Sequence, residues 1–527
     1  MGSRLGSTTG GSGSTTGGSG STTGGSGSTA GVREPHPRPG VVIAVACYCG
    51  IVVALTQTMI IPLVPVLPRI LHSSASNASW AITATLLAAA VVMPIAGRLG
   101  DMFGKRLMLL LSLRALVAGS LICALSRALV MVVAGRALQG LAMGAIALGI
   151  SIMRDELPPE RVGSAVAQVS ATLGVGGAIG LPVAAVIAEK GSWHALFWVT
   201  AALAVVAVVA VLVLVPESPV KTPARFDVLG AIGLAAGLLM LLVAITKGGD
   251  WGWGDGLTLG LVGGALVVFL VWGAWELRTS APLVDLRVSA RPQVLFTNIS
   301  SVAVGFAMYG MSLIPTQILM APEQTGYGMG RSMIQAGLLL APSGFVMYLF
   351  SSVGARLSAA RGPRTSLSTG IVVIGAGYVS ALFLRDQPWE ITLATVFIGA
   401  GIGIAYAAMP ALIMGAVPIT ETAAANGLNA LMRSMGTSLS SAVVSVVLAH
   451  QVIRFGAVTL PSSHGFTLAL LISIAAAGVA LAFSLAIPRA ARAPEPVVTA
   501  DAVPADDGAD DGADDAVDDA DMAVSGS

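Results

Sequence analysis

The chain has 527 residues, of which 10% are charged and 55% are hydrophobic, and its formal net charge is +1. Soluble proteins carry about 25% charged residues, so this composition excludes a soluble globular protein and indicates that the bilayer is the solvent. The near-zero charge hides a division, because ten aspartates lie between Asp501 and Asp521, and without them the charge would be +11.

The two ends of the chain differ from the rest in composition. Residues 1–40 contain a seven-residue repeat of Gly, Ser and Thr, which cannot bury apolar area and is expected to be disordered. It lacks the apolar core of a signal peptide, so the first span is expected to direct insertion. Residues 488–527 are rich in Pro, Ala, Gly and Asp and are expected to form a disordered acidic tail.

Long apolar segments separated by short loops fill the region between these ends. A hydrocarbon core of about 30 Å needs roughly 20 apolar residues in a helix, and a helix satisfies its own backbone hydrogen bonds. The sequence therefore predicts an all-α polytopic membrane protein with 14 transmembrane helices. The predicted spans are residues 41–66, 80–99, 107–126, 129–151, 165–188, 195–215, 228–246, 257–275, 294–319, 334–355, 366–384, 391–414, 424–449 and 465–487.

The distribution of Lys and Arg between the loops predicts the orientation of these spans. With the N-terminus inside, eighteen basic residues lie on the inner side and seven on the outer side. Inner loops carry an excess of basic residues, so both termini are expected to be cytoplasmic.

The loop after the second span carries the most informative motif. It reads GRLGDMFGKR over residues 97–106, and it resembles the signature loop of the major facilitator superfamily. The resemblance implies a conformational latch between two halves, formed by Gly97, Asp101, Gly104, Lys105 and Arg106. A carboxylate in such a loop can bind a helix N-terminus. A degenerate copy of the motif, which lacks the acid, follows at residues 354–362. Such a weak internal repeat is what two related halves predict.

Spans four and five carry two further motifs. Arg136 and Gln139 lie in RALQG, which resembles an element of drug exporters in the superfamily, and the resemblance implies substrate or proton coupling. A charge within a span is costly and should face the bundle or a wet cavity. Gly176, Gly180 and Pro182 resemble in part an antiporter signature and suggest a pliable gate helix, although plain helix packing by the small residues is an equal alternative.

The order of further motifs resembles the 14-span drug:proton antiporter branch. They are WHALFW at 193–198, FDVLG at 226–230, WGWG at 251–254 and PLVDL at 282–286. The resemblance implies a major facilitator fold with a 6+2+6 arrangement. An N-terminal six-helix bundle is expected at 41–215, a two-helix insertion with linkers at 216–293, and a C-terminal six-helix bundle at 294–487.

Ionisable residues inside the spans suggest the substrate. No Asp or Glu lies deep in a predicted span, whereas Arg136 and Arg433 do, with Asn429 near Arg433. Gln57 stands where many relatives carry an Asp in the first span. Because a cavity with fixed positive charge favours neutral or anionic compounds, we expect such a substrate rather than a lipophilic cation.

These observations predict a secondary active exporter of drugs or secondary metabolites that works by proton antiport and alternating access. A proton-coupled importer of a small metabolite and a lipid translocase remain alternatives. We expect no enzymatic activity, cofactor, metal or nucleic-acid partner. The expected partners are a small-molecule substrate, protons and the lipid bilayer, and the expected state is a monomer in a bacterial inner membrane.

Overall fold

A computed structural model describes residues 39–488 except 61–62, 64–66, 74, 79, 191, 219–220, 222–224 and 456–457. The N-terminal repeat and the acidic tail, predicted to be disordered, lie outside the described residues, apart from the residues that flank the helices.

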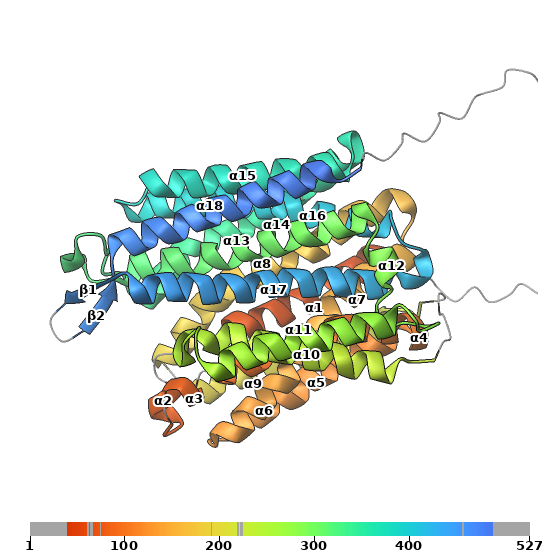
Figure 1. Ribbon diagram of the computed structural model, residues 1–527, viewed down its shortest axis with the longest axis horizontal. Coiled ribbons are helices and arrows are strands. Elements are labelled where there is room, and N and C mark those ends of the chain that lie inside the picture. The colour runs from red at the N-terminus through yellow and green to blue at the C-terminus, as the bar shows by residue number, and fades with distance from the viewer. Residues whose placement is uncertain are drawn as a thin grey trace, which may run out of the picture. The chain divides into compact units, whose positions relative to one another are not determined.

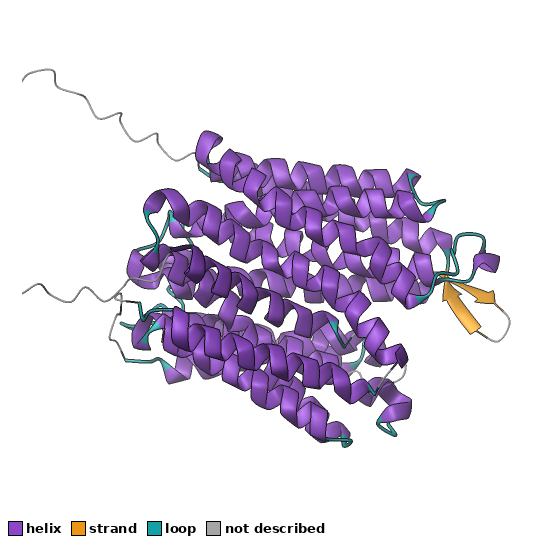
Figure 2. Cartoon of the chain, turned by 180° about the vertical axis from the view of Figure 1, so that it is seen from behind, coloured by secondary structure: helices purple, strands orange, loops and turns teal. Residues whose placement is uncertain are grey.

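The described residues form a helical bundle with one small hairpin (Figures 1 and 2). Within them, fourteen helical segments are long and apolar enough to cross a membrane, which confirms the predicted number of spans. The long helices are α1 (Pro39–Thr58), α4 (Trp80–Phe103), α5 (Lys105–Leu125), α6 (Leu129–Gly140), α7 (Gly144–Glu156), α8 (Pro159–Lys190), α9 (Trp193–Leu214), α10 (Val228–Trp251), α11 (Gly256–Glu276), α13 (Pro292–Met320), α14 (Met333–Arg361), α15 (Pro363–Phe383), α16 (Pro388–Met414), α17 (Thr422–His450) and α18 (Ser463–Ala486). Helices α6 and α7 form one span, joined by the 3₁₀ turn η2 (Leu141–Met143).

Short elements connect these helices. They are α2 (Leu67–Ile70), α3 (Ala75–Ala78), α12 (Leu286–Ser289), the 3₁₀ turns η3 (Glu323–Thr325) and η4 (Ile419–Glu421), and the strands β1 (Val452–Phe455) and β2 (Val458–Pro461). The strands form an antiparallel hairpin in which Ile453 pairs with Leu460. The sequence analysis did not predict this hairpin.

Local sequence explains where several helices begin and end. Helix α1 stops at Thr58 rather than continuing to residue 66, because the following prolines at 62 and 65 cannot donate helical hydrogen bonds. Ser332 begins α14 with a capping box, in which its hydroxyl accepts from Gln335 N and the Gln335 side chain returns to Ser332 N. Asp227 caps α10 by accepting from Gly230 N at 2.8 Å.

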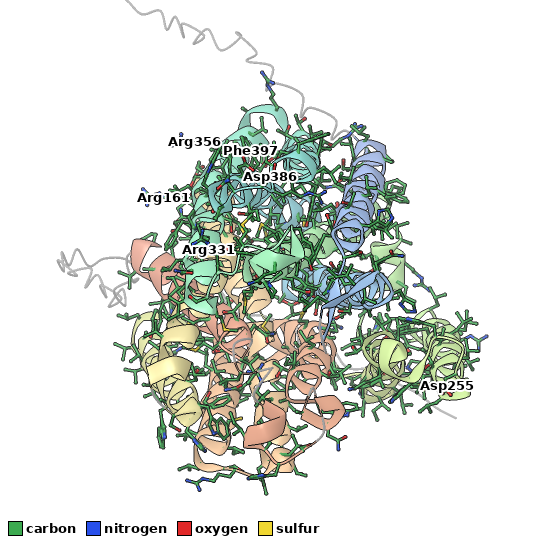
Figure 3. All side chains as sticks on the ribbon, turned by 90° about the vertical axis from the view of Figure 1, so that its left-hand side faces the viewer. Arg161, Asp255, Arg331, Arg356, Asp386 and Phe397 are labelled. Carbon is green, nitrogen blue, oxygen red and sulfur yellow. The ribbon has the colours of Figure 1, made fainter. Side chains whose placement is uncertain are left out.

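Two groups of helices pack around separate apolar cores. Helices α1–α9, the N-terminal half, share cores that include Leu113 and Leu148, and helices α13–α18, the C-terminal half, share one that includes Met347 and Tyr406. Seen end-on, helices α10 and α11 lie to one side of the two halves (Figure 3). This is the predicted 6+2+6 arrangement.

The halves meet along two seams, α4 against α17 and α8 against α14. Glycines allow close backbone approach at both. A Cβ on Gly427 of α17 would lie 2.5 Å from the Met93 carbonyl oxygen of α4, and one on Gly344 of α14 would meet the Gly174 carbonyl oxygen of α8. Helix α10 packs against both α4 and α17, and α11 packs against α10.

Candidate functional site

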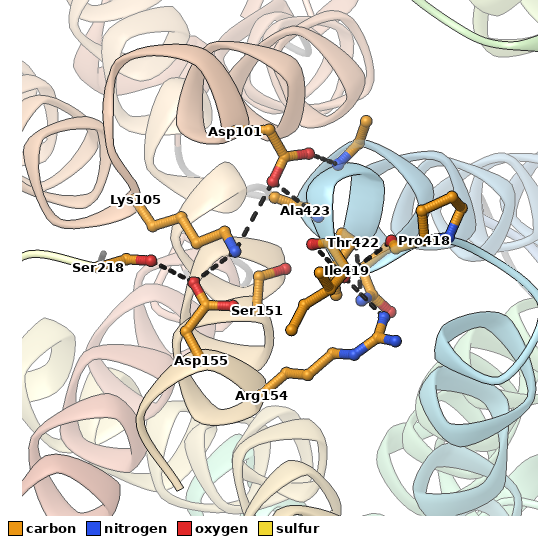
Figure 4. Close-up of polar contacts among 12 residues, drawn as sticks. Asp101, Lys105, Ser151, Arg154, Asp155, Ser218, Pro418, Ile419, Thr422 and Ala423 are labelled. Carbon is orange, nitrogen blue, oxygen red and sulfur yellow. Dashed lines mark hydrogen bonds and ion pairs between the residues drawn. The ribbon is translucent and has the colours of Figure 1, made fainter. Parts of the chain in front are cut away.

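Asp101, predicted to form a latch, joins the two halves. Its side chain is 2% exposed, and its two carboxylate oxygens accept hydrogen bonds from Ala424 N at 2.9 Å and Ala423 N at 3.3 Å, at the N-terminus of α17 (Figure 4). The first amides of a helix have no intrahelical acceptor and carry partial positive charge. One carboxylate therefore satisfies two amides of the opposite half.

Basic and acidic side chains of the N-terminal half hold Asp101 in place. Lys105 Nζ lies 3.8 Å from Asp101 Oδ1 and 2.5 Å from Asp155 Oδ2, and all three side chains are buried. Ser218, which follows α9, donates to the same Asp155 oxygen. Arg154 reaches across the seam, where its Nη1 donates to Thr422 Oγ1 at 2.7 Å. We call Asp101, Lys105, Arg154, Asp155 and Thr422 the Asp101 cluster.

Two glycines of the motif give this loop its shape. Gly104 has a φ of +116°, which favours glycine, and it connects α4 to α5. A Cβ on Gly97 would meet the Ala423 carbonyl oxygen of α17. Arg106 Nη2 donates to the Leu212 carbonyl of α9 at 2.6 Å, a bond within the N-terminal half.

Arg136 lies within the N-terminal half and joins three of its helices. The side chain is 1% exposed; Nε donates to the Ala81 carbonyl at 3.0 Å, and Nη1 to the Thr56 carbonyl at 3.2 Å and Gln139 Oε1 at 2.7 Å. Gln139 Nε2 in turn donates to Ser120 Oγ at 2.8 Å. Gln57, half-buried, follows Thr56 directly. These contacts brace α1, α4, α5 and α6.

One guanidinium nitrogen of Arg136 lies beside a small cavity. Nη2 is buried without a hydrogen-bond partner, and Arg136 lines a cavity of about 10 Å³ together with Met59, Phe197 and Thr200. A cavity of about 10–15 Å³ holds roughly one water molecule. In this conformation the site therefore has room for a water beside the guanidinium but not for a drug-sized compound.

Arg433 lies in a second polar cluster within the C-terminal half. Its Nη1 donates to Asn429 Oδ1 at 2.8 Å, and its guanidinium carbon lies 5.0 Å from the ring centre of Tyr406 on α16. Asn429 Nδ2 donates to Asn298 Oδ1 at 2.9 Å and Ser301 Oγ at 2.8 Å, both on α13. Stacking on an aromatic face suits a weakly hydrated guanidinium.

The structure does not bring the two buried arginines together. Every contact given above for Arg136 lies in the N-terminal half and every one for Arg433 in the C-terminal half. Among the described residues, no carboxylate pairs with either guanidinium within 4.0 Å; the salt bridges there are those of Lys105 with Asp101 and Asp155. Neutral oxygens and a π face therefore hold both charges.

The glycines of span five pack against α1. A Cβ on Gly176 would lie 2.5 Å from Ala54 Cβ and 2.8 Å from the Ile51 carbonyl oxygen, and one on Gly180 would meet the Thr58 hydroxyl. Pro182 lies inside α8 and faces Gly337 of α14, whose added Cβ would be 3.4 Å from the proline Cδ. The predicted gate helix thus contacts both halves.

Several members of these clusters escaped the sequence analysis. Arg154, Asp155, Thr422 and Ser218 belong to none of the motifs described in the sequence analysis. The sequence marks Tyr406 only as a polar residue within a span, and its ring contact with Arg433, 27 residues later, follows from tertiary packing. The MRDE run at 153–156, which concentrates charge directly after an apolar span, was the one available hint.

Comparison with known proteins agrees with the fold and the motifs. The sequence profile of the Major Facilitator Superfamily matches residues 46–441. The tetracenomycin C resistance and export protein of Streptomyces glaucescens is 28% identical over 407 residues, which are 76% of this chain and 74% of that protein. The probable actinorhodin transporter of Streptomyces coelicolor is 26% identical over 440 residues, 78% of this chain and 73% of that protein.

A solved structure shows the same fold. The human organic anion transporter MFSD10 (TETRAN) superimposes with a TM-score of 0.60 at 15% sequence identity, over 86% of this chain and 100% of that one. Together with the profile match, which extends from the first predicted span into the thirteenth, the fourteen helices and the glycine-lined seams identify the family. The chain belongs to the major facilitator superfamily and is a multi-pass membrane transporter.

Proposed function

We infer that this transporter exports neutral or anionic drugs or secondary metabolites in exchange for protons, by alternating access between its two halves. Export is supported by one relative named for tetracenomycin C resistance and export and by another named a probable actinorhodin transporter. The substrate preference rests on one observation: Arg136 and Arg433 are buried in the halves, and within the described residues neither has a carboxylate partner. A lipophilic cation would meet positive charge without compensation.

Alternating access is supported by the chemistry of the seam. The Asp101 cluster holds α4 and α17 together through hydrogen bonds to helix-end amides and through Arg154, and all of these bonds can break without unfolding either half. Hydrogen bonds to charged groups contribute about 1.5–3 kcal/mol each, a size that a few substrate contacts or one protonation step can offset. The halves would then rock about a midplane site.

The same proposal places the protein in a bacterial inner membrane with both termini in the cytoplasm, working as a monomer. The excess of basic residues in the loops at the end of the bundle that carries the Asp101 cluster supports this orientation. Gly176, Gly180 and Pro182 would act as the gate helix, since they contact α1 and α14. A proton-coupled importer is the alternative, because the same scaffold serves both directions.

Transport in inverted membrane vesicles against a panel of anionic, neutral and cationic aromatic compounds tests the substrate preference. We expect accumulation of anionic or neutral compounds, and we expect Arg433→Gln to reduce transport of anionic ones by at least about tenfold, since a charge-assisted hydrogen bond contributes about 1.5–3 kcal/mol. Arg114→Gln is the matched control, because Arg114 is an exposed arginine of α5. Efficient export of lipophilic cations by the intact protein would contradict the preference.

A further inference from the structure

Glu276, at the end of α11, is a buried carboxylate that the proposed transport cycle does not use. The residue is 3% exposed, although its sequence position at the end of a span suggested a solvated charge. The amides of Leu283 and Val284 and the indole N–H of Trp272 face it, but neither carboxylate oxygen has a partner at hydrogen-bond geometry. Trp272 Nε1 instead donates to the Gly230 carbonyl at 2.9 Å.

A second carboxylate faces Glu276 across the start of α10. A Cβ built on Gly230 would contact Asp227 Oδ2 and lie 2.7 Å from Glu276 Oε1, so both oxygens lie against the same face of that glycine. Asp227 is well supplied with donors: Gly230 N at 2.8 Å and Trp275 Nε1 at 3.1 Å. Asp227 thus has donors at hydrogen-bond distance, whereas neither carboxylate oxygen of Glu276 has one.

Charged groups on the neighbouring segments do not compensate Glu276. Arg287 on α12 donates to the Leu277 carbonyl at 3.0 Å, and Asp285 caps α12 by accepting from Arg287 N at 2.8 Å. Arg225 and Arg278 are exposed. The side chains with which α10 packs on α4 and α17 are apolar, such as Leu87 and Leu431.

We propose that Asp227 and Glu276 form a proton-binding site in the two-helix insertion, in which Glu276 carries the proton and shares it with the Asp227 carboxylate. A buried carboxylate without a hydrogen-bond partner, beside a second, half-buried carboxylate, favours the binding of one proton between them. The ligand is a single proton taken up from the aqueous side of the bundle that holds the Asp101 cluster. The proposal does not depend on the direction or the substrate of transport.

The bound proton fastens the segment that follows α11. Leu283 and Val284 are 1% and 6% exposed and pack in one apolar cluster with Leu234 of α10, Met93 of α4 and Leu431 of α17. When Glu276 loses its proton, two adjacent anions draw in water beneath this segment. The site therefore makes the attachment of α10 to both halves dependent on pH.

Infrared spectroscopy of the reconstituted protein tests the site without any transport assay. We expect a C=O stretching band of a protonated carboxyl in neutral buffer, absent from Glu276→Gln and retained in Asp255→Asn, which alters the carboxylate cap of α11. Asp227→Asn removes the neighbouring anion while keeping a helix-capping residue, so the band should weaken. Identical bands in the intact protein and in Glu276→Gln would overturn the proposal. If Glu276→Gln does not fold, an unchanged band in Asp227→Asn would overturn it instead.

Cysteine labelling tests the consequence for the linker. Val284→Cys, in a background with Cys47, Cys49 and Cys123 replaced, should react faster with a membrane-impermeant maleimide as the pH rises. Thiol ionisation itself accelerates labelling as the pH rises. The informative quantity is therefore the labelling rate of Val284→Cys divided by the labelling rate of the double variant Val284→Cys, Glu276→Gln at the same pH. A ratio that rises several-fold with pH supports the site, and a constant ratio overturns the coupling to the linker.

Discussion

Replacing Asp101 should shift the equilibrium between the closed and open arrangements of the α4–α17 seam. In Asp101→Asn the amide oxygen can replace one of the two bonds to Ala423 N and Ala424 N, but the negative charge opposite the helix N-terminus and Lys105 is lost. Losing one hydrogen bond to a charged group and the helix-end interaction costs about 2–3 kcal/mol. Since 1.4 kcal/mol is a tenfold change in an equilibrium constant, the ratio of open to closed molecules should rise roughly 30- to 150-fold.

Spin labels at the exposed positions Arg161 of α8 and Arg361 of α14 can report this shift as a distance distribution. The intact protein should show mainly the short distance of the closed seam, and Asp101→Asn should populate a longer one. Arg106→Gln is the matched control: Arg106 donates to the Leu212 carbonyl within the N-terminal half, so the variant should keep the short distance. An unchanged distribution in Asp101→Asn would refute the latch.

Three further substitutions probe the packing around the seam and the arginines. Gly176→Ala should impair transport and lower thermal stability, because its Cβ would collide with α1. Gly177→Ala should be tolerated, since the atom nearest to its Cβ lies 3.9 Å away. Equal effects of the two variants in transport and melting assays would contradict the packing argument. Arg136→Lys keeps the charge but cannot reproduce the forked contacts, so it should destabilise the solubilised protein by about 2 kcal/mol, seen as a lower melting temperature. Tyr406→Leu removes the ring that contacts Arg433, a cation–π interaction that contributes about 0.5–2 kcal/mol. Initial-rate measurements should show an apparent KM raised several-fold for anionic substrates and unchanged for neutral ones.

The sequence predicted the fold well because the bilayer constrains it strongly. Fourteen apolar segments, a glycine-rich loop with one acid and a basic pair, and a degenerate second copy sufficed for a 6+2+6 bundle. The hairpin β1–β2 escaped prediction because its strands are four residues long, too short for an alternating pattern to be distinctive.

Side-chain partners were far less accessible from sequence. Span helices are apolar on all faces, so periodicity does not tell which way Arg136 or Arg433 points. The two arginines lie in different halves, as their spans predict, but the structure gives them separate sets of partners where the sequence suggested one shared cavity. Glu276 shows the reverse case: a residue at a span end normally reaches water, and only the packing of Trp272, Leu283 and Val284 around it reveals its burial.

Substrate-evoked proton flux in proteoliposomes tests the central claim most directly. A pH gradient is imposed across the membrane and an anionic aromatic compound is added on the side of the Asp101 cluster. The account predicts proton movement opposite in direction to the substrate, reduced at least about tenfold by Arg433→Gln and preserved by Arg114→Gln. Proton movement in the same direction as the substrate, or none at all while the compound still crosses, would contradict it.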